Sequence, residues 1–465
     1  MRAGSPISRR QFLVASAEVG FGMAALSGVS GWAASQQVLV PGAGERVRLA
    51  VCGIRKRGFD HVRLFSQIPN VQVVALCDVD ESVLRQRLAD MDKLGLPKPQ
   101  TYTDVRKLLE DKSIAAVCIA TPHHWHTLIA IWACQTGKDV YVEKPCSHNW
   151  WESRQLMRAA KRYGRIVQHG TQTRSSASAR EAIAHVQKGL IGEVYLARGL
   201  CFKRRNSIGH TPAEPVPEGM HYDLWTGPAP VHPFTRNRFH YNWHWFWAYG
   251  NGDLGNQGVH QVDIARWGLG VGFPNKVTAL GGHFVNDDDQ ETPNTLNCAF
   301  QYDLPGGKRK MIEFEVRHGI TNREADIGTD KLGSGNQGPN VIGNIFYGSD
   351  GYLALGDEDT GNAYQAWLGS EMKAGPSSHQ GGSRYHFANF IEALRSRKQE
   401  DLHAPLEEAH ISCTLVHLAN ASYRLGRALN FDPKTEQVIG DHEANRLLRD
   451  ADRGYRRPFV IPERI

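Results

Sequence analysis

A glycine turn and an acidic residue that follows it have the types and the order of a dinucleotide-binding site. Residues 53–58, with the sequence G-I-R-K-R-G, come directly after an apolar run, and Asp78 ends the next apolar run. Where a strand meets a helix, backbone N–H groups hold a pyrophosphate, and a carboxylate after the second strand binds the ribose. Because Arg55 replaces the middle glycine of G-x-G-x-x-G, the alternative is a tight turn without a ligand. The residues predicted here to bind the dinucleotide are Gly53, Ile54, Arg57, Gly58 and Asp78.

Charged side chains near this turn bear on which dinucleotide binds. The Asp78 carboxylate favours two free ribose hydroxyls and repels a 2'-phosphate, so we predict NAD. Arg55, Lys56 and Arg57 carry the opposite charge. NADP therefore stays open as the alternative cofactor.

The segments that must position this turn alternate between short β-branched runs and helical stretches. Strands separated by helices in this way are typical of a parallel, doubly wound sheet. We predict a Rossmann domain over residues 46–170. Its expected strands are 47–52, 71–77, 115–120, 139–142 and 166–169, and its expected helices are 58–67, 124–136 and 151–163.

The sequence changes character after Gly170. Several later runs alternate apolar and polar residues, and the turn sequences D-L-P-G-G and S-D-G separate neighbouring pairs, as in antiparallel hairpins. The fold class predicted for the whole chain is α/β. We predict a C-terminal α/β domain over residues 171–430 with a largely antiparallel sheet. A tail is expected at 431–465. The expected strands are 194–202, 277–282, 296–302, 310–316, 342–347 and 352–355, the expected helices 175–188, 260–267, 385–395 and 406–427, and the expected exposed loop 328–343.

The N-terminal segment has the pattern of an export signal. Residues 8–13, S-R-R-Q-F-L, precede a modestly apolar stretch that ends in small residues near Ala34, as in twin-arginine signals. Glu18 and interspersed Gly and Ser residues disfavour a membrane span. We predict that residues 1–35 are a signal peptide, that the mature protein has no membrane segment, and that it works in the periplasm or outside the cell. A twin-arginine signal implies export of a folded protein that already carries its cofactor.

Charge and cysteine content exclude other classes of protein. The net charge of +6 is spread thinly, without the basic block of a nucleic-acid-binding protein. Eight cysteines without a C-x-x-C pair predict neither a disulfide framework nor a zinc site. The histidines His123, His124 and His126 stand too close together at a helix start to converge on one cation, so no metal is predicted.

Three further motifs follow along the chain, the first two directly after expected strand ends. T-P-H-H-W-H occupies residues 121–126, E-K-P occupies 143–145, and L-G-N-Q-G-V-H-Q-V-D occupies 254–263. With the glycine turn, this order resembles the glucose-fructose oxidoreductase/inositol dehydrogenase/rhizopine catabolism (Gfo/Idh/MocA) family over residues 46–430. The resemblance implies NAD(P)-dependent oxidation of a carbohydrate and a tendency to form homo-oligomers. It adds to the cofactor-binding residues Thr121, Pro122, His126, Glu143, Lys144 and Pro145.

The resemblance also assigns catalytic roles. In the family, the lysine of E-K-P and the histidine of the last motif handle the substrate hydroxyl proton, which here implies Lys144 and His260. These residue types suit the chemistry, since a histidine accepts a proton near neutrality and a lysine opposes charge on the substrate oxygen. Asn256 stands where the family has an aspartate, and an amide hydrogen-bonds a hydroxyl without taking its proton. The alternatives are a surface ion pair of Lys144 with Glu143 and a structural role for His260.

Aromatic residues between positions 236 and 249 suggest contact with a sugar ring. Aromatic faces pack on the C–H faces of sugars, and Trp243 and His244 are the expected contacts. The alternation of Trp243, Trp245 and Trp247 also fits one face of a buried strand. The resemblance places Gln172 and Arg174 at the substrate cleft.

Three functions agree with these residues. The first is an exported oxidoreductase that takes a hydride from a hydroxyl of a sugar, sugar acid or glycoside and retains its cofactor between turnovers. The second is a redox-neutral glycosidase or lyase that oxidises the sugar, eliminates a substituent and reduces the product again. The third is a non-catalytic sensor of sugar and dinucleotide, since Asn256 reduces the number of acid/base groups.

Overall fold

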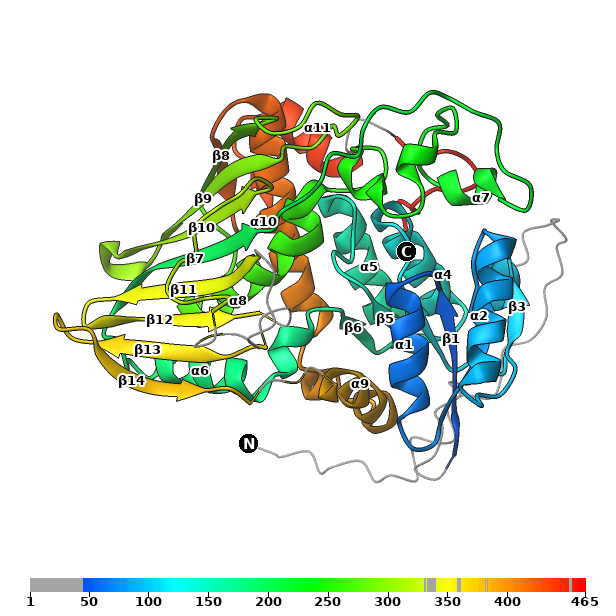
Figure 1. Ribbon diagram of the computed structural model, residues 1–465, viewed down its shortest axis with the longest axis horizontal. Coiled ribbons are helices and arrows are strands. Elements are labelled where there is room, and N and C mark those ends of the chain that lie inside the picture. The colour runs from blue at the N-terminus through cyan, green and yellow to red at the C-terminus, as the bar shows by residue number, and fades with distance from the viewer. Residues whose placement is uncertain are drawn as a thin grey trace, which may run out of the picture. The chain divides into compact units, whose positions relative to one another are not determined.

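The computed structural model describes residues 45–329, 332, 340–357, 361–380, 382, 384–450 and 454–465 (Figure 1). The predicted signal at 1–35 lies outside the described residues, as does most of the loop expected at 328–343. In the described part, no helix combines the length and the apolar character that a bilayer crossing requires.

A parallel sheet forms the N-terminal part of the described chain, as predicted. This part, residues 47–169, is called the first half of the chain below, and the residues that follow it are called the second half. Within the described residues it has six strands in the order β3-β2-β1-β4-β5-β6, so the order reverses between β1 and β4. Ligands of doubly wound sheets bind at such a switch point, outside the carboxyl ends of the strands. The strands are β1 (Val47–Cys52), β2 (Val71–Cys77), β3 (Gln100–Tyr102), β4 (Ala116–Ile119), β5 (Asp139–Val142) and β6 (Val167–His169).

Helices cover both faces of this sheet. Val47, Leu49 and Val51 of β1 pack in one apolar cluster, whereas Ala50 and Cys52 pack in another, because successive side chains of a strand point to opposite faces. The first cluster includes α1, α2 and α9, and the second includes α3, α4 and α5. The bounds are α1 (Arg57–Ser66), α2 (Glu81–Lys93), α3 (Val105–Leu109), α4 (His123–Gln135), α5 (Trp150–Tyr163) and α9 (Tyr385–Ser396).

A mostly antiparallel sheet forms the second half, also as predicted. Its order in the described residues is β14-β13-β12-β11-β7-β10-β9-β8-β15-β16, and β7 and β10 pair in parallel. The strands are β7 (Val194–Phe202), β8 (Lys276–Gly282), β9 (Thr295–Asp303), β10 (Arg309–Arg317), β11 (Val341–Gly348), β12 (Gly351–Gly356), β13 (Tyr364–Leu368), β14 (Lys373–Ser378), β15 (Leu429–Asp432) and β16 (Gln437–Val438).

The helices of the second half lie against the large sheet and against the Rossmann part. α8 packs on β7, and α10 packs on both β8 and α5, so α10 joins the two parts of the fold (Figure 1). Residues after 430, expected as a tail, contribute half of β15, all of β16 and a further helix that packs on α5 and α10. The helices are α6 (Ala177–Gln187), α7 (Tyr222–Thr226), α8 (Val259–Leu269), α10 (Leu406–Leu425) and α11 (His442–Asp450).

Candidate active site

A cavity of about 1160 Å³ opens at the carboxyl ends of β1, β2, β4 and β5. Residues of the second half of the chain close it, among them Lys203, Gln257 and Asp357. Most residues predicted from the sequence meet here. Those that line the cavity are Gly53, Arg57, Gly58, Asp78, Thr121, Pro122, His126, Glu143, Lys144, Gln172, Trp243, His244, Asn256 and His260.

At its two glycines, the turn at the end of β1 is too tightly packed for a side chain. Gly53 has a φ of +76°, and a Cβ added there would lie 2.7 Å from the carbonyl oxygen of Ala120. A Cβ on Gly58 would lie 1.8 Å from the carbonyl oxygen of Gly53. Both positions therefore require glycine, and the turn brings bare backbone to the cavity at the start of α1. A pyrophosphate needs such a surface.

Asp78, at the end of β2, is held in place by backbone donors. Its two carboxylate oxygens accept the N–H groups of Ile54 at 3.0 Å and Asp80 at 3.1 Å. Burial raises the pKa of Asp78 to about 6, and the two N–H donors and Arg55 oppose that rise. Each oxygen keeps a second lone pair for a ribose hydroxyl. Ile54, predicted as a cofactor contact, is fully buried and does not line the cavity; its N–H instead orients Asp78.

Glu143 gathers several side chains at the end of β5. Its Oε1 accepts hydrogen bonds from Arg57 Nε at 3.0 Å and Gln172 Nε2 at 2.9 Å, and His61 Nε2 lies 2.9 Å away. Burial alone would raise the pKa of Glu143, but the Arg57 charge and the contact with His61 hold it well below its ordinary value. Glu143 is therefore an anion that fixes Arg57 and Gln172 at the cavity wall.

Lys144 points across the cavity wall to the second half of the chain. Its Nζ donates to the backbone carbonyl of Asn256 and to Asn256 Oδ1, which lies 3.2 Å away. The alternative of a surface ion pair with Glu143 is wrong, because the amine contacts Asn256 while Glu143 accepts the backbone N–H of Lys144 at 3.3 Å. Burial lowers the pKa of Lys144 to about 8, against the opposing effect of the Glu143 charge.

A π-helical turn, η4 (Leu254–Gly258), leads into α8 and presents both Asn256 and His260 to the cavity. Burial and the nearby Lys144 charge hold the pKa of His260 well below its ordinary value, so the imidazole is neutral at neutral pH. His260 Nδ1 is buried and has no hydrogen-bond partner among the described residues. A π-helical turn within a helix is common at functional sites.

Asp253 is a buried carboxylate that the sequence analysis missed. Its side chain accepts hydrogen bonds from Asn256 Nδ2 at 2.9 Å and Arg205 Nη2 at 2.9 Å, and His318 Nε2 lies 2.7 Å away. Burial would raise the pKa of Asp253, but the Arg205 charge and His318 hold it well below its ordinary value. An aspartate three residues before Asn256 was the available signal, although Arg205 and His318 lie too far along the chain to be connected with it.

The aromatic segment is not a strand. Asn242–Trp245 forms a 3-10 helix, η3, so Trp243, Trp245 and Trp247 do not share a strand face. Trp243 and His244 stack with ring centroids 3.6 Å apart, and both line the cavity. Trp245 is buried against His318 instead. The segment therefore offers one stacked pair to a ligand, and His240 and Tyr241 line the cavity beside it.

Two predicted contacts besides Ile54 lie outside the cavity. Arg174 pairs with Asp263 at 2.6 Å and with Glu408 at 3.0 Å, so its guanidinium joins α8 to α10 and does not face the cleft. Pro145 does not line the cavity, and its carbonyl oxygen lies 2.7 Å from His126 Nδ1. His126 Nε2 lies 2.7 Å from the carbonyl oxygen of Thr121. His126 therefore links the ends of β4 and β5.

The neighbouring histidines do not converge. His123 Nδ1 lies 3.2 Å from Asn251 Oδ1, and His124 Nε2 lies 2.9 Å from the carbonyl oxygen of Trp225. With His126 held by two backbone carbonyls, the three rings contact three different parts of the chain.

Family models match both halves of the chain. Residues 47–171 match the oxidoreductase family with an NAD-binding Rossmann fold, and residues 193–279 and 378–458 match the C-terminal α/β domain of the same family. The chain belongs to the Gfo/Idh/MocA oxidoreductase family. The glycine turn and Asp78 fit the NAD that this family's Rossmann domain binds.

Curated proteins similar to this Gfo/Idh/MocA chain carry glycosidase names. A "Glycosyl hydrolase family 109 protein 1" of Shewanella sp. (strain ANA-3) is 35% identical over 122 residues, which are 25% of this chain and 27% of that protein. An "Alpha-N-acetylgalactosaminidase" of Shewanella oneidensis is 29% identical over 203 residues, 40% of this chain and 44% of that protein. The chain thus aligns with less than half the length of these two relatives.

Solved structures of low sequence identity share the fold. The WlbA dehydrogenase from Bordetella pertussis, in complex with NADH and UDP-GlcNAcA, has a TM-score of 0.62 and 19% identity, covering 83% of this chain and 99% of its own. Levoglucosan dehydrogenase, with NADH and levoglucosan, has a TM-score of 0.61 and 16% identity over 83% of this chain and 99% of its own. These structures therefore share their fold with most of the chain.

Proposed function

We propose that the protein oxidises a hydroxyl group of a sugar, sugar acid or glycoside, with Lys144 and His260 handling the hydroxyl proton. NAD, when bound, accepts the hydride. The observation that carries the proposal is the meeting of Lys144, Asn256 and His260 in the cavity that also holds the glycine turn. A cavity of about 1160 Å³ has room for a dinucleotide with a small substrate beside it.

The shifted pKa values of Lys144 and His260 give the two residues different roles toward the substrate hydroxyl. Lys144, with a pKa lowered to about 8, is still largely protonated at pH 7 and donates to the substrate oxygen. His260 is neutral and accepts a proton. Asn256 holds the lysine amine and cannot itself take a proton. Trp243 and His244 offer a flat apolar surface for a sugar ring.

A second function is favoured by the glycosidase names of the curated relatives. In this version, oxidation of one hydroxyl to a carbonyl makes a neighbouring C–H acidic, and loss of that proton expels the substituent from the ring. Water then adds, and the hydride returns to the carbonyl. The net reaction is hydrolysis, and the cofactor ends in the state in which it began.

Mass analysis of sugars and glycosides incubated with the purified protein and NAD distinguishes these functions. Loss of two hydrogens from a substrate supports the oxidoreductase, and a cleaved substituent without net redox change supports the glycosidase. Absence of turnover over a broad panel, with ligand binding retained, supports the non-catalytic sensor and overturns both catalytic proposals.

We also propose that the protein is exported and retains its cofactor. The support is the twin-arginine pattern at residues 8–13 and the lack of free dinucleotide outside the cytoplasm, which would stop an enzyme that released its cofactor. Protein purified without added dinucleotide should release about one NAD(H) per chain on denaturation. Replacement of both Arg9 and Arg10 by lysine should retain the protein in the cytoplasm. An empty protein that exchanges cofactor freely would contradict retention.

Assembly into a homo-oligomer is a further proposal. Leu280 on β8 and Tyr195 on β7 are 81% and 54% exposed, and each follows a buried residue, Ala279 and Val194. Exposed apolar residues on a sheet face are typical of subunit interfaces. Size-exclusion chromatography with light scattering measures the mass, and Leu280→Glu should shift it toward the monomer.

A further inference from the structure

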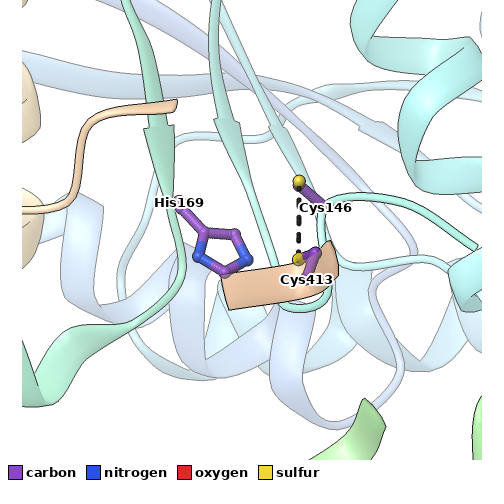
Figure 2. Close-up of side chains that lie close together, drawn as sticks. All are labelled: Cys146, His169 and Cys413. Carbon is purple, nitrogen blue, oxygen red and sulfur yellow. Dashed lines mark hydrogen bonds between the residues drawn. The ribbon is translucent and has the colours of Figure 1, made fainter. Parts of the chain in front are cut away.

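Two cysteines and a histidine from distant segments meet outside the active-site cavity. Cys146 follows β5, His169 ends β6, and Cys413 lies in α10 (Figure 2). Their ligand atoms all lie within 4.8 Å of one another, and the three residues are no more than 1% exposed. None of them lines the cavity. The cluster is therefore separate from the chemistry proposed above.

The spacing of the two sulfur atoms matches a shared cation. Cys146 Sγ and Cys413 Sγ are 3.7 Å apart. A tetrahedral zinc ion with bonds of about 2.3 Å to each sulfur places two thiolates about 3.8 Å apart. A disulfide requires about 2.05 Å. The sulfurs thus already stand at the separation that two zinc-bound thiolates adopt.

One ring nitrogen of His169 has a hydrogen-bond partner, and the other has none among the described residues. Its Nδ1 lies 3.4 Å from the Thr171 hydroxyl, whereas its Nε2 is buried and has no hydrogen-bond partner among the described residues. A histidine that binds a metal holds its other nitrogen in a hydrogen bond of this kind. A buried polar nitrogen without a partner is costly, and a cation would satisfy it.

From these observations we propose that Cys146, His169 and Cys413 bind a thiophilic divalent cation, with zinc the best fit. On binding, each thiol loses its proton, so one Zn²⁺ replaces two H⁺ and the site of two thiolates and a neutral imidazole has no net charge. That neutrality suits a buried position, whereas Cu⁺ would leave one negative charge. Three protein ligands leave the fourth position of the tetrahedron to a water.

The cation would connect three parts of the fold. Cys146 lies two residues after Lys144, and Cys413 lies in the helix that packs on both parts of the chain. A bound zinc would tie the E-K-P segment to α10 and so fix the backbone that carries Lys144. This site does not depend on the proposed function, because it concerns metal content and stability.

The test is the metal content of the full chain, purified without a metal-affinity column and measured by inductively coupled plasma mass spectrometry. We expect about one zinc per chain. Cys146→Ser, Cys413→Ser and His169→Ala should each lose the zinc. Cys298→Ser, which changes a buried cysteine far along the chain, is the matched control and should retain it. Loss of zinc should also lower the melting temperature of the wild-type protein.

Cobalt(II) provides a readout that needs no variant. Protein refolded or expressed with Co²⁺ in place of zinc should show the near-ultraviolet thiolate-to-cobalt charge-transfer absorption of two sulfur ligands, so the proposal remains testable if the variants fail to fold. A metal-free protein with both thiols reduced would overturn the proposal. A protein mass lower by two hydrogens, which would show a Cys146–Cys413 disulfide, would also overturn it. Zinc retained in all three variants would overturn it as well.

Discussion

Lys144 and Asn256 come from different halves of the chain, and the amine of one lies 3.2 Å from the side-chain oxygen of the other. The same amine also donates to the backbone carbonyl of Asn256. A protonated lysine has three N–H donors, so one donor remains for a substrate oxygen. The hydrogen-bond donor to the substrate oxygen in the proposed reaction is thus aimed by the half of the chain that closes the cavity.

Replacement of either proton-handling residue should slow turnover without abolishing cofactor binding. We expect Lys144→Ala and His260→Ala each to lower kcat about 10²- to 10⁴-fold, because general acid/base assistance has that magnitude. The Kd for NADH, measured by fluorescence titration, should change far less than kcat. Lys276→Ala, on an exposed position of β8, is the control and should keep wild-type rates. Two variants with near-wild-type rates would contradict the assignment.

The rate should fall as the pH rises through the pKa of Lys144. Burial lowers that pKa to about 8, and a donor works only while it is protonated. We therefore expect kcat/KM to decline above about pH 8 by roughly tenfold per pH unit. Lys144→Arg should be slower but should lose this alkaline decline, since arginine stays protonated. A decline that persists unchanged in Lys144→Arg would assign the titration to another group.

Asn256→Asp, which introduces the aspartate that the family resemblance implies, should harm this protein. The Asn256 amide donates to Asp253 at 2.9 Å, and a carboxylate there would repel Asp253 and lose that hydrogen bond. We expect Asn256→Asp to lower the free energy of unfolding by about 1–3 kcal/mol and to reduce turnover. Asn297→Asp, at an exposed position of β9, is the control in denaturant titrations. Improved activity would indicate instead that the site works best with the carboxylate.

The glycine turn should not tolerate a methyl group at its second glycine. The Cβ of Gly58→Ala would lie 1.8 Å from the carbonyl oxygen of Gly53, so the turn must open and its N–H groups must shift. We expect the affinity for NADH to fall at least about tenfold, because the pyrophosphate contacts depend on that backbone. Gly272→Ala meets no atom within 4 Å and should bind NADH as the wild type does. If both variants bind NADH with equal affinity, this turn does not bind the pyrophosphate.

The sequence predicts the Rossmann half well because its strands are buried on both faces and follow one another locally. β1, β4 and β5 are short apolar runs, and chemistry-bearing residues come directly after them. Those positions converge because parallel strands end at the same edge of the sheet. Lys144 therefore reaches the cavity from the end of β5, whereas Asn256 and His260 reach it from η4 and α8, as the family resemblance implies.

Prediction failed where a partner lies far along the chain. Arg174 resembles a cleft residue, but its partners Asp263 and Glu408 decide its position, and no local pattern connects them. Period-two alternation near Trp243 mimics a strand, whereas a tight 3-10 turn forms instead. Sequence spacing cannot predict the contact of Cys146 with Cys413, because the two residues belong to different parts of the fold.

The helix α9 closes the Rossmann sheet from the far end of the chain. Phe387 lies 5.2 Å from Phe65 and 5.2 Å from Tyr141, measured between ring centroids. During synthesis the ribosome releases the strands of this sheet, α1 and α2 long before it releases α9, so the part of the apolar face that α9 covers stays open until most of the chain has emerged. The nucleotide-binding half therefore cannot complete its folding on the ribosome ahead of the rest, and the nascent chain has to be shielded from aggregation over that interval.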